Sequence, residues 1–313
     1  HSQVPSAAAG AAPCERAKVP ADQLAGKGVF GVGDTPRPSL GPVTRSRSRA
    51  PADRNGLAMS PLHGSGSCGY VDINRNFGIR QFWNSSNGGS STDSCSGGSG
   101  TYRGKSPFSE IETLNYMNFV NSRNFNAAFN AHTYGNYLIK PWAWSDPTPT
   151  PDDNIFNQFL SDMSETSGYT TGAASQTVGY TVRGGTDDWC YNDSVHTGHH
   201  IFGITPETGD DFWPPQSDIL PFAQNMLYSN QYMSLITGAF VNPLSEKFNQ
   251  LTYDPGQSGN LKILFKNKGL LNASNVKIIL TPVSAGLTIP AQQFSYSSIN
   301  SFVSDSCMFD FSI

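Results

Sequence analysis

The sequence predicts an α/β protein in which a mixed β-sheet is flanked by helices and followed by a small β-sandwich module. Strand-like and amphipathic helical segments alternate from about residue 64 to 238, and this alternation is typical of layered α/β folds. After about Val241 the helical pattern stops, and strand-like segments rich in Thr and Ser take over. We therefore predict an atypical segment over residues 1–63, an α/β domain over 64–238, and a β-sandwich accessory module over 241–313 that could be incomplete at Ile313.

Composition and charge narrow the class of protein. Only 14% of the 313 residues are charged, against roughly 25% in typical soluble domains, which favours a secreted or extracellular protein. The net charge of −4 argues against nucleic acid as a partner, because phosphate neutralisation needs a basic face. No apolar run approaches the roughly 20 residues that a membrane span needs. The cysteines form no C-x-x-C pair, so a cysteine-based zinc site is not expected, although Cys68 and Cys95 could form a disulfide.

Residues 1–63 differ from the rest of the chain. They are rich in Ala, Pro, Gly, Ser and Arg and show neither helical nor strand periodicity, so disorder is the expected state. The chain begins at His1 without a methionine or a signal-peptide pattern, and we interpret it as processed or as a fragment. The composition changes abruptly near Gly64. One hypothesis is therefore that residues 1–63 were read in the wrong reading frame or rearranged. A genuine insertion is the alternative, and sequencing the encoding DNA separates the two.

The elements of the α/β domain follow in order. The segment 69–77 alternates apolar residues before Asn74 and Arg75, which predicts a short strand that delivers an arginine to its end, with a surface turn as the alternative. Ser109 and Glu112 have the spacing of a capping box, so a helix is expected after them. A short strand over 126–131 should end at His132.

Three further elements complete this prediction. An amphipathic helix is expected after Asp152 and Asp153, and a strand over 200–205 that leads to Glu207. The segment 169–185 reads as turn-rich, and a third helix should run from near Ser217 to about residue 236. In the C-terminal module the strands expected are 261–266 and 276–280.

Three side chains are candidates for chemistry. His132 follows a strand, where α/β proteins place ligand-binding groups, although a single histidine is more often a structural hydrogen-bonding residue. Glu207 also closes a strand, and an exposed loop carboxylate is the alternative. Tyr191 lies in a turn, where simple packing is the alternative. None of these residues is specific by itself.

Their succession along the chain is specific. In order, the sequence contains the blocks D-I-N-R-N-F, Y-R-G-K-S-P-F-S-E-I-E-T, F-N-A-A-F-N-A-H-T-Y, G-G-T-D-D-W-C-Y-N, and T-P-E-T-G followed by F-W-P-P. This succession resembles the zinc metallocarboxypeptidase family, the carboxypeptidase A-like peptidases, over about residues 64–238. The resemblance implies that 64–238 is a catalytic domain, that Zn²⁺ is the cofactor and that the C-terminus of a peptide or protein is the substrate.

The resemblance also implies a role for each matching residue. Asn74 and Arg75 match the pair that grips the terminal carboxylate of the substrate, and His132 matches the third zinc ligand. Tyr191 matches the mobile tyrosine that closes over the bound C-terminus. Glu207 matches the catalytic glutamate, the general base that activates zinc-bound water. The side-chain preference of the enzyme is not fixed by these matches.

The zinc-binding half of the family pattern is missing. No H-x-x-E occurs in the 313 residues. The nearest approach is His1, a weak candidate, with Val4 at the glutamate position, and valine cannot bind zinc. The family's W-R-K-N-R stretch, whose arginine faces the oxyanion, is absent too, and Arg54 is only a weak substitute.

A substitute metal site is the next possibility. His196 and His200 have i, i+4 spacing, but they would need a helix to face one point, and the stretch with His199 reads as extended. Two functions therefore remain: a secreted zinc carboxypeptidase, or an inactive relative that binds peptide C-termini or serves as a scaffold. Zinc content and hydrolysis of a blocked dipeptide would separate them.

Overall fold

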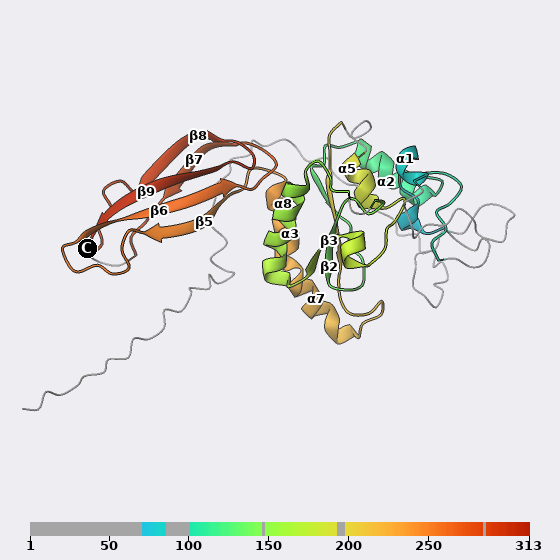
Figure 1. Cartoon of the computed structure of the whole chain (residues 1–313), viewed down its shortest axis with the longest axis horizontal. Coiled ribbons are helices and arrows are strands. Elements are labelled where there is room, and N and C mark those ends of the chain that lie inside the picture. Colours follow the sequence, from blue (N-terminus) through green and yellow to red (C-terminus); the bar gives the residue numbers. More distant parts are fainter. Residues whose placement is uncertain (1–70, 86–99, 146–147, 193–197, 284–285) are drawn as a thin grey trace, which may run out of the picture. The chain divides into compact units, whose positions relative to one another are not determined.

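The computed structural model describes residues 71–85, 100–145, 148–192, 198–283 and 286–313 (Figure 1). Every described residue belongs to one compact unit, Pro51–Ile313. The predictions for residues 1–63, including His1, and for the Cys68–Cys95 pair lie outside the described residues. His196 does so as well.

A four-stranded mixed sheet forms the centre of the α/β part, in the strand order β1-β4-β2-β3. Strand β4 is parallel to β1 and antiparallel to β2, and β2 is parallel to β3. This confirms the predicted fold class. The strands are β1 (Ala127–Phe129), β2 (Tyr137–Lys140), β3 (Thr170–Ala173) and β4 (Phe202–Glu207).

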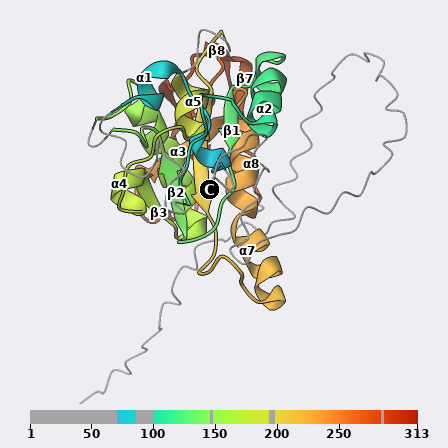
Figure 2. The ribbon, with the colours of Figure 1, turned by 90° about the vertical axis from the view of Figure 1, so that its right-hand side faces the viewer.

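Helices pack around this sheet, and α3 and α8 lie against each other beside it (Figures 1 and 2). The predicted helices exist, but the third divides near Met226, and the segment expected to be turn-rich contains β3 and a short helix. No described helix combines the length and apolar character that crossing a membrane requires. The helices are α1 (Arg80–Trp83), α2 (Ile111–Asn121), α3 (Asp153–Ser167), α4 (Ala174–Thr177), α5 (Thr186–Asn192), α7 (Ile219–Asn225) and α8 (Leu227–Ile236).

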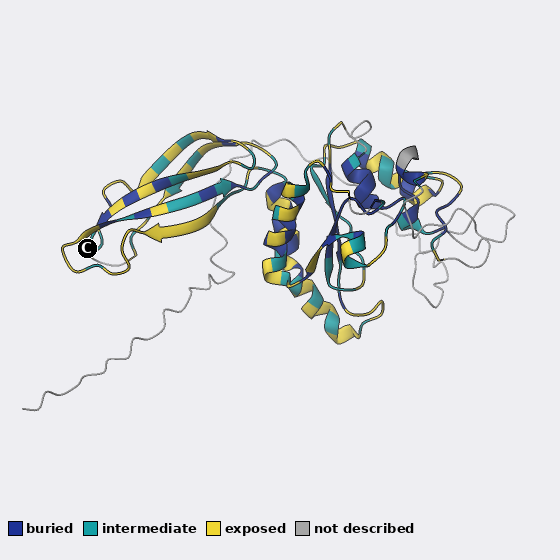
Figure 3. Cartoon of the chain, viewed as in Figure 1, coloured by how far each residue is buried: buried dark blue, intermediate teal, exposed yellow. Residues whose placement is uncertain are grey.

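The central core lies on one face of the sheet. Alternate residues of the strands point to the same side, so Leu138 of β2 and Ile204 of β4 both reach this core and are fully buried. Helix α3 contributes Phe156 and Phe159, which are also fully buried. Figure 3 shows the buried stripe of α3 and the largely exposed α7. The intervening strand residues point to the opposite face, which is where the site lies.

The segment before α1 is a 3-10 turn and not the predicted strand. A 3-10 helix, η1, covers Ile73–Arg75, and the Asp72 side chain accepts a hydrogen bond from the backbone N–H of Asn74 at 3.0 Å. A side chain that satisfies the backbone two residues on favours a turn over an extended ladder. The correction concerns geometry only, because Arg75 is still placed at the end of the segment.

The capping box predicted for Ser109 is wrong, although the helix is present. The first helical residue of α2 is Ile111, and the preceding Glu110 makes no side-chain cap. The Ser109 hydroxyl accepts from Asn76 Nδ2 at 2.9 Å and donates to Glu110 Oε1 at 2.9 Å. A tertiary partner, Asn76, therefore occupies the hydroxyl that the local pattern assigned to capping.

The C-terminal residues form two further sheets that enclose their own core. A three-stranded antiparallel sheet has the order β5-β6-β9, and β7 pairs with β8. Phe265 and Phe309 are fully buried between them. The predicted strands correspond to β6 and β7. The bounds are β5 (Val241–Phe248), β6 (Ser258–Asn267), β7 (Ala273–Ile279), β8 (Gln293–Ile299) and β9 (Ser304–Ser312), and a short 3-10 turn, η2 (Gln216–Asp218), precedes α7.

Candidate active site

A cavity of about 730 Å³ opens on the sheet face opposite the central core. Asn130 and His132 line it from the end of β1, and Thr205 and Glu207 line it from β4. The pleat of the strands explains this grouping, because residues two apart point to the same side. Of the five sequence-predicted site residues that the structure describes, four line this cavity: Asn74, Arg75, His132 and Glu207.

Arg75 is held at the cavity by its own turn. Its side chain is 10% exposed, its Nη1 donates to the Asn74 carbonyl at 3.1 Å, and the same nitrogen lies 3.8 Å from the Asp72 carboxylate. Burial raises the pKa of Asp72, and the charge of Arg75 opposes that rise. A nearly buried guanidinium keeps its charge, so it favours an anion that enters the cavity.

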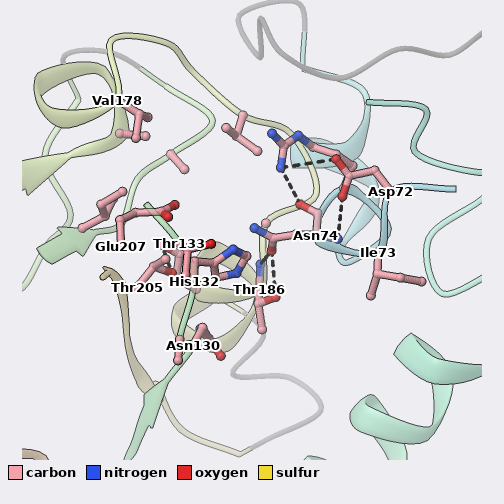
Figure 4. A pocket seen from close by; sticks show the side chains of 18 of the residues that line it. Asp72, Ile73, Asn74, Asn130, His132, Thr133, Val178, Thr186, Thr205 and Glu207 are labelled. Carbon is pink, nitrogen blue, oxygen red and sulfur yellow. Dashed lines mark hydrogen bonds and ion pairs between the residues drawn. The ribbon is translucent and has the colours of Figure 1, made fainter. Parts of the chain in front are cut away.

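Asn74 has a fixed orientation beside this arginine. Its side-chain oxygen accepts from the Thr186 hydroxyl at 3.0 Å and from the Thr186 backbone N–H at 3.2 Å (Figure 4). This pair of donors determines which end of the amide is oxygen. The Asn74 Nδ2 donor therefore points away from Thr186, and it is available to a second acceptor in the cavity.

A glycine permits the close approach that makes these contacts. Gly184 has φ of +74°, and a Cβ atom there would lie 2.0 Å from the carbonyl oxygen of Arg75. Its own carbonyl accepts from the Phe77 N–H at 3.1 Å. The loop that leads into α5 can lie against the Arg75 backbone only without a side chain at this position.

Asn76 fastens the same turn to α2. This fully buried amide donates to the carbonyl of Arg103 at 2.8 Å and accepts from the Thr113 hydroxyl at 2.6 Å, in addition to its bond with Ser109. All of these partners are distant in sequence. The Asn-Arg-Asn block therefore combines two residues that face the cavity with one that is wholly structural.

His132 and Glu207 lie side by side across the two strands. They form a parallel bridge, in which the His132 N–H donates to the Pro206 carbonyl at 2.9 Å (Figure 4). Burial, reinforced by the charge of Arg75, lowers the pKa of His132, which favours the neutral imidazole. Burial also raises the pKa of Glu207 to about 7, with Arg75 opposing and Asp187 reinforcing the rise.

Asp187 is a cavity residue that the sequence did not single out. It is 5% exposed, and burial raises its pKa to about 6. Its carboxylate accepts from the Thr205 hydroxyl at 3.4 Å and from the Asp188 N–H at 3.1 Å. An acidic pair such as Asp187-Asp188 at a helix start is usually solvated, so only the tertiary fold reveals this burial.

The neighbouring Asp188 points elsewhere. It accepts from the backbone N–H groups of Ala143 at 2.8 Å and Trp144 at 3.0 Å, so it holds the chain that follows β2. Burial raises its pKa, and the Asp187 charge raises it further. Of the two adjacent carboxyl groups, one is structural and one faces the cavity.

Tyr191 lies away from the cavity. It is 1% exposed, stacks on His200 and donates its hydroxyl hydrogen to Asp152 at 2.8 Å, so it ties α5 to the start of α3. This placement does not suit a tyrosine that closes over a ligand. Tyr180 lines the cavity instead and is 46% exposed. An aromatic residue in a glycine-containing loop, with no apolar pattern to bury it, is the signal that could have found Tyr180.

The described residues do not fit a complete zinc site. Among them, no three His, Cys, Asp or Glu side chains gather at a point that could hold a metal ion. His132 offers one imidazole at the cavity. His199 bonds to the Phe125 carbonyl and His200 to the Tyr191 carbonyl, so neither contributes to this site. One imidazole with one nearby carboxylate is fewer ligands than a catalytic zinc normally has in proteins.

Comparison with known proteins supports the same family as the order of the sequence blocks does. A family model described as zinc carboxypeptidase matches residues 41–229. Carboxypeptidase A1 of Sus scrofa is 34% identical over 169 residues, which are 51% of this chain and 38% of the relative. Zinc carboxypeptidase A 1 of Drosophila melanogaster is 28% identical over 173 residues, 52% of this chain and 39% of the relative. The chain thus spans about two-fifths of the length of these curated relatives.

Two solved structures match part of the chain. Bovine thrombin-activatable fibrinolysis inhibitor, in complex with tick carboxypeptidase inhibitor, matches with a TM-score of 0.46 and 25% identity, over 55% of this chain and 58% of that one. Carboxypeptidase A from Helicoverpa armigera matches with a TM-score of 0.46 and 18% identity, over 56% of this chain and 44% of that one.

Proposed function

The chain belongs to the zinc carboxypeptidase family, and we propose that its cavity binds the C-terminal residue of a peptide or protein. The observation that carries this proposal is the convergence of Asn74, Arg75, His132 and Glu207 on one cavity of about 730 Å³. A cavity of this size lies within the range of roughly 300–1,000 Å³ that is typical of small-ligand sites. The proposal is argued from the residues that the family model matches. The peptide C-terminus is proposed as the substrate of the whole protein as well.

The terminal carboxylate would bind at Arg75 and Asn74. A guanidinium offers paired N–H donors that match the two oxygens of a carboxylate, and the Nδ2 of Asn74 adds a neutral donor beside it. Both groups are held by contacts within the protein before any ligand arrives, through Thr186 for Asn74 and the 3-10 turn for Arg75. Little conformational entropy is therefore lost on binding.

The side chain of the bound residue would point toward Asp187. This carboxylate is buried, lines the cavity and has no cation within hydrogen-bonding distance among the described residues, although the charge of Arg75 acts on it from farther away. A positively charged side chain would compensate its buried charge. We therefore propose that C-terminal lysine or arginine is preferred over apolar residues.

Glu207 is the group that could move a proton. Its pKa of about 7 allows it to accept and release a proton near neutral pH, which is the property of a general base. It lies beside His132 at the same cavity. Family members hydrolyse the last peptide bond with zinc, but the residues described here do not fit a complete zinc site, so we derive no hydrolytic step. Catalysis is the second candidate function, and the raised pKa and cavity position of Glu207 support it.

Peptide binding tests the main proposal. Calorimetry should show that a short peptide with a free C-terminal carboxylate binds, and that its C-terminal amide binds at least about tenfold more weakly, since charge-assisted bonds to Arg75 are lost. Arg75→Gln should cause a similar loss. Arg123→Gln, which changes an exposed arginine just after α2, is the matched control and should bind as the unaltered protein does. Equal binding of acid and amide would refute the carboxylate site.

Zinc content and turnover test the second candidate. Stoichiometric zinc, with chelator-sensitive release of the C-terminal residue that Glu207→Gln abolishes, would establish a carboxypeptidase. Binding of the same peptides without zinc and without turnover would establish a binding protein. Absence of both binding and turnover would leave the family assignment intact but refute the function proposed for this cavity.

A further inference from the structure

An N-x-S triplet, the pattern that accepts N-linked oligosaccharides in secreted proteins, stands at the start of β7 as Asn272, Ala273 and Ser274. Its middle residue is alanine, and only proline there would exclude the pattern. Two other triplets begin at Asn84 and Asn192, but the serine that completes each lies outside the described residues. A triplet this short also arises by chance, so its position in the fold decides whether it can carry a sugar.

The pleat of the chain separates the two polar side chains of the triplet from the middle one. Ala273 is 5% exposed and belongs to the core of the C-terminal sheets, whereas Asn272 and Ser274 are exposed. Since residues two apart along an extended chain point to the same side, the carboxamide and the hydroxyl face solvent together. An oligosaccharide on Asn272 would therefore project into water without displacing a core residue.

The carboxamide of Asn272 also has the orientation that this modification requires. Its Oδ1 accepts from the backbone N–H of Ser301 at 2.9 Å, and this donor determines which end of the amide is oxygen. The nitrogen Nδ2, to which a sugar is joined in N-linked glycosylation, makes no hydrogen bond with any described residue. The fold thus uses the oxygen of the amide and leaves the nitrogen free to carry a substituent.

We propose that Asn272 is a site of N-linked glycosylation. The co-reactant is an oligosaccharide carried on a lipid pyrophosphate, the donor that the secretory pathway supplies. A bond forms between Nδ2 and the anomeric carbon, the bond from that carbon to the pyrophosphate oxygen breaks, the oxygen keeps the electron pair, and Nδ2 releases one proton. The amide oxygen remains an acceptor, so the bond from Ser301 is compatible with the product. The step requires entry into the secretory pathway, which the low content of charged residues favours, and it does not depend on the cavity.

The test detects the sugar directly. The full chain, preceded by a cleavable signal peptide, is expressed in eukaryotic cells and recovered from both the cell extract and the medium. Loss of the signal peptide identifies chains that entered the secretory pathway, whether or not they were exported. Peptide-N-glycosidase converts a glycosylated asparagine to aspartate, so mass spectrometry of treated and untreated samples identifies the modified residue. We expect the enzyme to cause this conversion at Asn272.

Ser274→Ala distinguishes a glycosylation site from a structural asparagine. It removes the hydroxyl of the triplet but leaves the Asn272 side chain and its bond to Ser301 in place, so the conversion should be lost. Ser274→Thr keeps the pattern and should keep the conversion. Ser298→Ala is the matched control and should keep it too, because Ser298 is an exposed serine opposite Ser274 on β8. Unmodified Asn272 in chains that have lost the signal peptide, or a conversion that survives Ser274→Ala, would overturn the inference and leave the proposed function unaffected.

Discussion

Asp187 shows most clearly how a single side chain depends on its surroundings. In an unfolded chain an aspartate has a pKa near 3.9, whereas burial in the cavity raises it to about 6. A raised carboxyl pKa means that the folded protein binds its proton more tightly than the unfolded chain does. The stabilisation is complete below the unfolded pKa and is lost as the pH rises through the folded pKa.

Asp187→Asn should therefore change the pH dependence of stability. The stability difference between the variant and the unaltered protein should shift toward the variant by roughly 2 kcal/mol between pH 4 and pH 7, because each pKa unit corresponds to about 1.4 kcal/mol and part of the titration lies outside this range. Relief of the repulsion that Asp187 exerts on Asp188 acts in the same direction. Urea unfolding of both proteins at several pH values measures this shift, and a constant difference would show that Asp187 stays ionised in the fold.

Tyr191 and Tyr180 also differ in their surroundings. Tyr191 and Tyr180 lie eleven positions apart, and both precede the strand that ends at Glu207. Block matching selected Tyr191, but its ring is packed among other rings and its hydroxyl is bonded to Asp152. Tyr180 has the exposure and the cavity position that a closing side chain needs, and we propose it for that role.

At the scale of elements, the loop that enters α5 governs the geometry of the site. It brings Gly184 against the Arg75 carbonyl and Thr186 against Asn74, so one loop positions both residues of the proposed carboxylate grip. Neither contact is visible in the local pattern of 169–185, because the partners are more than a hundred residues upstream. The sequence showed two adjacent glycines but not which one the fold required.

Gly184→Ala should damage both stability and peptide binding. The added Cβ would meet the Arg75 carbonyl oxygen at 2.0 Å, so the loop or the turn must shift, in addition to the cost of about 1–2 kcal/mol for a left-handed alanine. Gly168→Ala is the matched control, since Gly168 also has positive φ but no atom within 4 Å of the added Cβ. We expect the control to lose about 1–2 kcal/mol of stability in thermal unfolding and to bind peptide normally. Equal behaviour of the two variants would contradict the role given to the loop.

At the scale of the whole described molecule, a buried ion pair joins α3 to the turn after β6. Lys268 Nζ donates to Asp162 at 2.9 Å, and the side chains are 12% and 7% exposed. Asp162 also accepts from the Tyr232 hydroxyl of α8 at 2.5 Å. The backbone adds to this connection, since the Leu270 N–H donates to the Ile236 carbonyl at 2.8 Å. The C-terminal strands and the α/β part should therefore unfold together.

Lys268→Met should test that coupling. Removing one partner of a buried pair leaves the Asp162 charge uncompensated and typically costs about 3–5 kcal/mol. All five tryptophans precede residue 214, so tryptophan fluorescence reports the α/β part alone. Its unfolding midpoint in urea should fall in Lys268→Met and should not change in Lys277→Met, a substitution at an exposed lysine of β7. An unaltered tryptophan transition in Lys268→Met would mean that the two parts unfold independently.

The sequence by itself determined the family, the alternation of strands and helices, and four of the residues that meet at the cavity. These follow from local signals: periodicity identified α3 and β4, and block order identified Asn74, Arg75, His132 and Glu207. The tertiary structure alone decided that segment 73–75 is a 3-10 turn, that Tyr180 and not Tyr191 lines the cavity, and that the buried Asp187 lines it too. The physical reason is that burial, and the hydrogen bonds formed across the sheet and between distant loops, depend on neighbours that are far away along the chain.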